Sequence, residues 1–317
     1  MEREAATPFR PRRPRRSLLN LLRRNTLALL VLVVALAGLY QLLARRSAGP
    51  PYPSREDASL RILSLSPNVT EILFRLGLAD QVVGVTDFCR HPPEAEEKPK
   101  VGGLLNPSLE RMFALDPNLA ILLPAHGDLP KKLSSRGIRS LVVRNDTVED
   151  VLQSIRAIGE ETGKAEAAGA LIDSMEAAVA AIQSGPPPRA RRAMIVVGRA
   201  GGTIDDVSVA GTGTFLDQLL RMAGGKNVFD RSVVPYPQPG LEEIVHRNPE
   251  VILELRPEGV DAAVESRAAL SAWSLLPDLE AVKRGNVFVL TEEYLVVPGP
   301  RFDQALERIA EALREAR

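Results

Sequence analysis

The chain offers few residues that could carry out covalent chemistry or hold a metal ion. Its three histidines are His91, His126 and His246, and its single cysteine is Cys89. Borderline metal ions need several ligands aimed at one point, so scattered histidines are a weak basis for a metal site. A single cysteine excludes an internal disulfide and any zinc site built on paired cysteines. We therefore expect no bound metal ion and no cofactor.

Two glycine-rich stretches, at 198–202 and 211–213, are candidates for a phosphate-binding loop. Neither is followed by Lys-Ser or Lys-Thr at the required spacing, and neither has the pattern G-x-G-x-x-G. The nucleophile motif G-x-S-x-G and the metalloprotease motif H-E-x-x-H do not occur in the sequence. The adjacent carboxylates Glu292 and Glu293 are typical of a solvated loop. These observations argue against an enzyme.

The charges of the chain are divided unevenly. Lys and Arg total 40, as do Asp and Glu, so the formal net charge is zero. Residues 1–25 carry eight arginines against two glutamates, and the following residues, 26–44, carry no charge. A helix of that length, at about 1.5 Å per residue, nearly spans a hydrocarbon core of roughly 30 Å. Arginines before such a run keep that end in the cytoplasm, which explains this basic cytoplasmic head better than binding to nucleic acid.

Two interpretations of residues 26–44 remain open. The run is either an uncleaved transmembrane anchor, which we favour, or a cleaved signal sequence. Ala35-Leu36-Ala37 fits the small-residue pattern of a signal-peptide cleavage site. Residues 45–60 contain several prolines and are predicted to be a linker. Both interpretations place residues 47–317 outside the cytoplasmic membrane, either tethered to it or secreted to the periplasm.

From residue 61 onward, short apolar runs alternate with amphipathic stretches, which is typical of α/β units around a mostly parallel sheet. We predict an N-terminal α/β lobe at 61–146 and a C-terminal α/β lobe at 189–317. Residues 147–188 are predicted to contain two helices end to end, the second from about Lys164, that join the lobes as a long, rigid connection. Strands are expected at 61–65, 81–85, 119–123, 141–144, 193–197, 251–255 and 287–290, and helices at 68–76, 107–115, 129–135, 213–222, 241–247, near Ser271 and at 302–314.

The two halves of the chain share a repeated unit. A shift of 239 − 107 = 132 residues places segment 107–119 on segment 239–251, and both begin with Pro-x-Leu-Glu. In each copy, an Asp-Pro or Asn-Pro turn then leads into a predicted strand. Glu110 of the first copy falls on Glu242 of the second. Such a repeat predicts two pseudo-symmetric lobes.

Five motifs in order carry a resemblance to a known family. They are RILSLSPNVTEILFRLG, VVGVTDFCRHPPEA, NPSLERMFALDPNLAILL, VPYPQPGLEEIVHRNPEVIL and PGPRFDQALERIAEAL. Over about residues 61–315 the chain resembles the periplasmic binding proteins of ABC importers for cobalamin and ferric siderophores, above all the cobalamin-binding members. The resemblance implies two α/β lobes joined by one long helix, with the ligand held in the cleft between them. The repeat and the predicted connecting helices agree with this architecture.

The resemblance also implies a set of ligand-contacting residues on loops at the carboxyl ends of strands, where α/β folds place their ligands. These residues are Phe88, Leu104, Leu123, Tyr236, Glu293 and Tyr294. Where cobalamin-binding members carry tryptophan, this chain has Leu104, Leu123 and Tyr236, and the family arginine after Tyr294 is absent. We therefore expect an apolar pocket for a bulky metal chelate, either a corrinoid or a ferric chelate. Simple loop packing is the alternative role for Phe88 and Tyr236.

The repeated glutamates have two possible roles. The resemblance implies that Glu110 and Glu242 meet arginines on the two subunits of an ABC importer permease. A carboxylate early in a helix also stabilises that helix, which is the alternative. The expected function is capture of a chelate outside the membrane and delivery to the importer. The alternative function is a membrane-anchored sensory or scaffold domain that has the same fold and no transport role.

Overall fold

The computed structural model describes residues 59–185, 189–199, 204, 206–257 and 262–317. Ser59–Arg317 forms one compact unit. The basic head, the apolar run at 26–44 and nearly all of the predicted linker lie outside the described residues. Within the described residues, no helix has the length and apolar character needed to cross a membrane.

The N-terminal lobe is built on a four-stranded parallel sheet in the order β2-β1-β3-β4. Its strands are β1 (Ile62–Ser64), β2 (Val82–Val85), β3 (Leu119–Leu122) and β4 (Arg139–Val142), and its helices are α2 (Pro67–Arg75), α3 (Leu109–Ala114) and α4 (Leu129–Ser134), with single 3-10 turns η1 (Ala79–Gln81), η2 (Pro93–Ala95) and η3 (Pro124–His126). Every residue of β1 and β3 is buried, as expected for central strands of a sheet that is covered on both faces.

The C-terminal lobe contains a five-stranded sheet in the order β6-β5-β8-β9, with β7 also beside β5. Its strands are β5 (Arg192–Arg199), β6 (Val207–Val209), β7 (Lys226–Asn227), β8 (Val251–Leu255) and β9 (Val287–Leu290), and its helices are α7 (Phe215–Met222), α8 (Leu241–Arg247), α9 (Ala262–Trp273), α10 (Glu280–Lys283), η4 (Glu293–Val296) and α11 (Phe302–Glu315). Only the pairing of β5 with β6 is antiparallel among the described strands. The sequence did not predict β6, β7 or α10, because such short elements show no periodicity.

The two lobes repeat one arrangement, in agreement with the internal repeat of the sequence. Helices α3 and α8 begin at Leu109 and Leu241, and the strands that follow them, β3 and β8, begin at Leu119 and Val251. Both pairs are separated by 132 residues (241 − 109 and 251 − 119). The predicted two-lobe α/β architecture is therefore confirmed.

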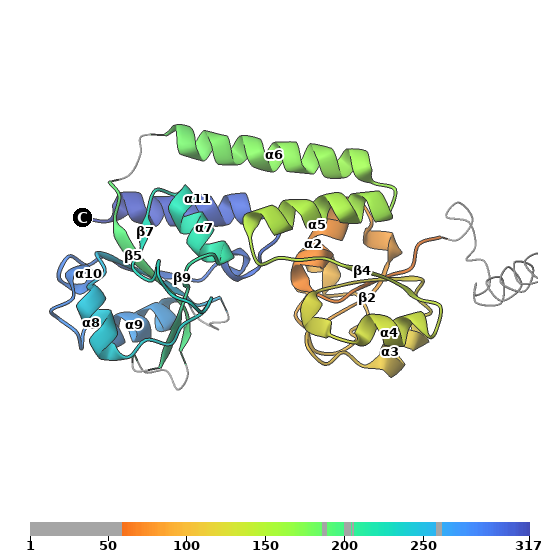
Figure 1. The fold of residues 1–317 in the computed structure, drawn as a ribbon, viewed down its shortest axis with the longest axis horizontal. Coiled ribbons are helices and arrows are strands. Elements are labelled where there is room, and N and C mark those ends of the chain that lie inside the picture. The colour runs from red at the N-terminus through yellow and green to blue at the C-terminus, as the bar shows by residue number, and fades with distance from the viewer. Residues whose placement is uncertain (1–58, 186–188, 200–203, 205, 258–261) are drawn as a thin grey trace, which may run out of the picture. The chain divides into compact units, whose positions relative to one another are not determined.

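The connection between the lobes differs from the prediction. Helices α5 (Val148–Glu161) and α6 (Ala165–Ser184) fold back on each other instead of lying end to end, and α6 also packs on α11 (Figure 1). Gly163 has a φ of 70°, a left-handed conformation that turns the chain after α5. At Gly159, a Cβ atom would collide with the Cβ of Ala168. The expectation of an end-to-end pair was wrong because these glycines make a turn and a close helix contact.

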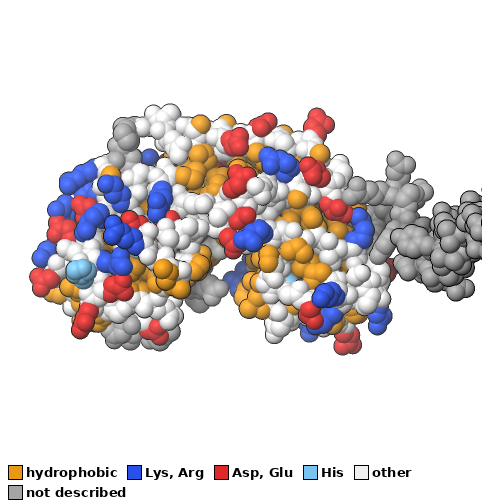
Figure 2. Space-filling view, viewed as in Figure 1, with side chains coloured by type: hydrophobic (Ala, Val, Ile, Leu, Met, Phe, Trp, Pro, Cys, Tyr) orange, Lys and Arg blue, Asp and Glu red, His pale blue; other side chains and the backbone are white. Residues whose placement is uncertain are grey.

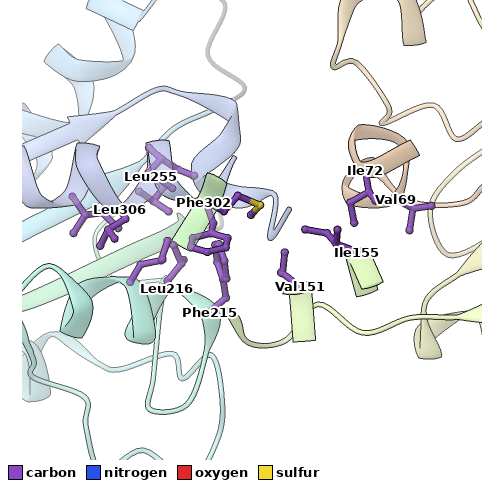
Figure 3. Packing of buried hydrophobic residues seen from close by; sticks show 14 of the residues in the cluster. Val69, Ile72, Val151, Ile155, Phe215, Leu216, Leu255, Phe302 and Leu306 are labelled. Atoms are coloured by element: carbon purple, nitrogen blue, oxygen red, sulfur yellow. The ribbon is translucent and has the colours of Figure 1, made fainter. Parts of the chain in front are cut away.

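One hydrophobic cluster runs from the N-terminal lobe through α5 into the C-terminal lobe. Figure 3 shows part of it, with Val69 and Ile72 from α2, Val151 and Ile155 from α5, and Phe215, Leu216, Leu255, Phe302 and Leu306 from the C-terminal lobe. Burial of each large apolar side chain stabilises the fold by roughly 1.5–3 kcal/mol. The backbone N–H of Val148 in α5 also donates to Oε1 of Gln218 in α7 at 2.8 Å. The lobes are therefore joined by shared packing as well as by the chain itself.

Candidate ligand-binding site

Two of the predicted ligand contacts lie together in the N-terminal lobe. Phe88 and Leu104 line one hollow of about 580 Å³. Its other lining residues are Asp87, Gly103, Leu105 and Asn106. The backbone N–H of Asp87 donates to the carbonyl of Gly102 at 3.0 Å, so the loop after β2 and the loop before α3 are held side by side. Phe88 is 49% exposed and Leu105 is 70% exposed, which leaves a rim of apolar side chains in contact with solvent.

Tyr236 lies in the C-terminal lobe on the loop between β7 and α8. Two backbone hydrogen bonds flank it: Val209 N–H donates to Pro237 at 3.0 Å, and Gly211 N–H donates to Pro235 at 2.7 Å. A Cβ on Gly211 would lie 3.0 Å from the Pro235 carbonyl oxygen, so this close approach of two chain segments favours glycine. The loop is therefore fixed at its backbone while the ring of Tyr236 stays half exposed.

Tyr236 shares its loop with exposed apolar side chains. Burial, and secondly the carboxylate of Asp146, raise the pKa of the Tyr236 hydroxyl. Asp146 follows β4 in the N-terminal lobe. Val233 and Val234 on the same loop are exposed as well. Figure 2 shows hydrophobic side chains on both lobes beside the hollow between them. Apolar side chains gathered on a surface in this way are typical of a ligand or partner contact.

Arg301 organises Glu293 and Tyr294, which lie on η4 after β9. Its Nη1 donates to Oε1 of Glu293 at 3.1 Å, and its guanidinium lies over the ring of Tyr294, 5.6 Å from the centroid. Its remaining nitrogens, Nε and Nη2, donate to the two carboxylate oxygens of Glu71 in helix α2 at 2.9 and 2.6 Å. One buried guanidinium thus holds two of the predicted ligand contacts and reaches the other lobe.

His91 connects this group with the loop that carries Phe88. Its Nδ1 lies 3.6 Å from Oε1 of Glu293. Burial, followed by the nearby charge of Arg301, lowers the pKa of His91, and the Glu293 carboxylate opposes that shift. The structure therefore brings the loop after β2 and the η4 turn after β9 to one place, although about 200 residues separate them along the chain.

The other predicted residues lie apart from this group. Leu123 follows β3 but is only 8% exposed, because it packs into the cluster shared by the lobes. It offers little surface to a ligand in this state. Glu110 and Glu242 are exposed and lie on α3 and α8, and neither lines the hollow beside Phe88. Over the described residues, no group of three or more His, Cys, Asp and Glu side chains is arranged to hold a metal ion.

Glu71 and the role of Arg301 were not predicted from the sequence. Glu71 lies in the middle of α2, within a run of buried residues, and is 3% exposed. A carboxylate among buried positions of a helix needs a cation or several hydrogen bonds to offset its lost hydration. That was the available signal, although the sequence alone does not show which arginine supplies the cation.

Comparison with known proteins identifies the family. Residues 62–294 match the family described as "Periplasmic binding protein". The chain therefore belongs to the periplasmic binding protein family, which confirms the resemblance seen in its motifs. The coarser prediction of a binding protein that acts outside the cytoplasm is thereby confirmed, whereas anchoring by residues 26–44 stays a prediction.

Individual relatives show which kinds of periplasmic binding protein the chain is similar to. The "Uncharacterized ABC transporter substrate-binding lipoprotein YvrC" of Bacillus subtilis is 31% identical over 259 residues, covering 80% of this chain and 79% of the relative. A "Vitamin B12-binding protein" of Vibrio cholerae is 26% identical, covering 84% of this chain and 91% of the relative. Among solved structures, the periplasmic heme-binding protein RhuT from Roseiflexus sp. RS-1 in apo form has a TM-score of 0.70 at 26% identity, covering 82% and 99% of the two chains. These relatives are binding proteins, so the prediction that this chain is not an enzyme is confirmed.

Proposed function

We propose that the protein captures a bulky metal chelate between its lobes, outside the cytoplasmic membrane, and delivers it to an ABC importer. The candidate ligands are corrinoids, heme and ferric siderophores. The observation that carries the proposal is the presence of two half-exposed aromatic side chains, Phe88 and Tyr236, on loops of opposite lobes. Relatives named for vitamin B12 and for heme support the same ligand class.

The chemistry of the candidate site fits a ligand with broad apolar faces. Phe88, Leu104 and Tyr236 would cover such faces, and an aromatic ring stacked on a planar ligand adds about 0.5–1.5 kcal/mol beyond the area it buries. Glu293 is 46% exposed on its side chain and would supply a charged or hydrogen-bonding contact at the edge of the ligand. Affinity would come from enclosure and a few polar contacts, with no covalent step.

Delivery requires a partner that recognises both lobes. A permease dimer presents two equivalent surfaces, and the repeated helices α3 and α8 present equivalent glutamates, Glu110 and Glu242. Anchoring by residues 26–44 would keep the protein at the membrane that contains the permease. The smaller side chain at Leu104, which lines the hollow beside Phe88, would leave room for chelates other than cobalamin.

Direct binding measurements test the proposal. The full-length protein, solubilised in a mild detergent, is titrated with cyanocobalamin, dicyanocobinamide, hemin and several ferric siderophores. We expect saturable binding of at least one of them with a dissociation constant of about 1 μM or below, which corresponds to about 8 kcal/mol. The absence of saturable binding for all of them would overturn the proposed ligand class. Binding without any stimulation of a permease ATPase would favour the sensory or scaffold function.

A further inference from the structure

A buried ion pair ties the C-terminal segment of the chain to the N-terminal lobe. Arg301 and Glu71 are separated by 230 residues and meet through two hydrogen bonds of 2.9 and 2.6 Å. Both residues are nearly inaccessible, with Glu71 3% and Arg301 7% exposed. Burial raises the pKa of Glu71, whereas the hydrogen bonds and charge of Arg301 act in the opposite direction. A pair of this kind in two-bond geometry fixes the relative position of its two partners.

The same guanidinium also holds the η4 turn. Its third hydrogen bond joins Nη1 to Glu293 at 3.1 Å, and the guanidinium lies over the ring of Tyr294, so it contacts both side chains directly. Arg301 immediately precedes α11, and its carbonyl accepts the N–H of Ala305 at 3.2 Å. The guanidinium that contacts η4 therefore extends from a backbone position that α11 fixes.

The segment before Arg301 packs directly on α2. A Cβ placed on Gly299 would lie 3.3 Å from the Cβ of Asn68 and 3.6 Å from Oε2 of Glu71. The chain between η4 and α11 thus touches the N-terminal lobe through its backbone. This contact is independent of the ion pair and places η4 close to α2.

We propose that Arg301 is a positioning residue that couples η4 of the C-terminal lobe to helix α2 of the N-terminal lobe, and that its bond to Glu71 thereby sets the orientation of Glu293 and Tyr294 toward the ligand. The role of Glu293 and Tyr294 as ligand contacts rests on the proposed function. The coupling itself rests only on the contacts of Arg301.

The coupling differs from a simple stabilising role. A buried ion pair often adds little to the free energy of unfolding, because lost hydration offsets the attraction between the charges. If the pair served stability alone, its removal would lower the unfolding free energy without loosening η4 in particular. If Arg301 positions η4, changing Glu71 in the other lobe loosens η4 while the rest of the C-terminal lobe keeps its order.

Hydrogen–deuterium exchange measured by mass spectrometry separates these roles. The variants are Glu71→Gln, which removes the carboxylate, and Arg301→Lys, which keeps the positive charge but lacks the planar guanidinium that donates two hydrogen bonds to one carboxylate. In both, we expect amide exchange in residues 291–300 to be about tenfold faster, since a charge-assisted hydrogen bond is lost. Glu307→Gln is the matched control, because Glu307 pairs with Arg314 within α11 at 2.6 Å and should leave residues 291–300 unchanged.

Unchanged exchange of residues 291–300 in both variants would overturn the coupling. Arg301→Lys decides the matter if Glu71→Gln does not fold, because the lysine keeps a positive charge beside the buried carboxylate. A second experiment measures the binding of cyanocobalamin and hemin to the same variants. We expect about tenfold weaker binding by Glu71→Gln but normal binding by Glu307→Gln. Unchanged affinity in Glu71→Gln would refute the effect on the ligand. If the wild type binds neither probe, the proposed ligand class fails for these probes, whereas the exchange data still decide the coupling.

Discussion

Glu110 and Glu242 occupy the same position in the two lobes, as the second residues of α3 and α8. Both side chains are exposed, and within the described part of the chain neither carboxylate has an ion-pair partner. Neighbouring acidic residues often do pair, as Glu243 does with Arg247 at 2.7 Å. Two free carboxylates at equivalent positions are suited to a partner with two equivalent basic surfaces.

We predict that reversing both charges, with Glu110→Arg and Glu242→Arg, impairs uptake through the permease but leaves ligand affinity unchanged. Charge pairs at the rim of an interface mainly steer and orient association, so the defect should appear in docking. The control reverses two exposed charges on α6, Glu166→Arg and Glu176→Arg, which lie on the other side of the molecule from α3 and α8 (Figure 1). Normal uptake by the α3–α8 variant would refute the docking role.

The aromatic side chains of the two loops should contribute to ligand binding. Phe88→Ala and Tyr236→Ala are each expected to weaken chelate binding by about 0.5–1.5 kcal/mol, or more where the ring stacks on a planar ligand. Stability should change little, because both side chains are half exposed in the free protein. Leu275→Ala, at an exposed apolar position on the outside of the C-terminal lobe, serves as the control for calorimetry. If both aromatic variants bind as the wild type does, the ligand site lies elsewhere.

The sequence predicted the architecture of the lobes well, because their buried strands are short apolar runs that alternate with amphipathic helices. The start of α8 at Leu241 was predicted correctly, whereas α3 begins at Leu109, two residues after the predicted start, because the hydroxyl of Ser108 caps the helix by accepting the N–H of Arg111. The path between the lobes was not predictable in this way. Gly159 and Gly163 indicate a break in the helix, but the direction of the chain after that break depends on how closely α6 packs on α5.

The candidate site was predictable in its loops but not in its contacts. Phe88 follows closely on the predicted strand β2, so its loop could be assigned to the carboxyl end of that strand. Tyr236 lies in the longer segment between β7 and α8, and its loop could be assigned only through the resemblance. The pairing of Glu71 with Arg301 depends on tertiary packing across 230 residues, and no local pattern specifies it. Leu123 illustrates the same limit, because its burial depends on neighbours from other elements of the shared cluster.

The uncharged run after the basic head leads to a prediction about location. We expect the full-length protein to fractionate with the cytoplasmic membrane, because residues 26–44 are long enough to span it nearly completely. Protease added from outside the membrane should digest residues 47–317 and leave the basic head protected. A soluble periplasmic form that begins at Gly38 would instead show that the run is a cleaved signal sequence.

His91 should make stability sensitive to mild acid. Burial, followed by Arg301, lowers its pKa in the folded protein. As the pH falls below about 6.5, the unfolded chain therefore takes up a proton before the folded one does, and the free energy of unfolding decreases. We expect His91→Gln to lose less stability than the wild type between about pH 7.5 and about pH 5.5, as measured by urea unfolding. Equal losses in both proteins would contradict this effect, which should be small because the side chain is 39% exposed.

The hydrophobic cluster shared by the lobes predicts that they unfold together. Trp273 is the only tryptophan of the chain; it is 1% exposed and donates to Oε2 of Glu254 at 2.6 Å, so its fluorescence reports on the C-terminal lobe alone. Ile72 lies in α2 of the N-terminal lobe, where the cluster continues into Ile155 of α5 (Figure 3). Ile72→Ala should lower the free energy of unfolding by about 2–5 kcal/mol, since it leaves a cavity in a packed core.

If the lobes form one cooperative unit, this distant substitution shifts the Trp273 fluorescence transition in urea as far as it shifts the transition seen by far-UV circular dichroism. The slope of the transition should stay the same, because the surface exposed on unfolding is unchanged. Independent lobes would behave differently: the circular dichroism curve would divide into two steps, and the fluorescence midpoint would remain that of the wild type. We expect coincident curves, because truncation of Ile72 removes contacts from a core that also contains Phe215 and Phe302 of the C-terminal lobe.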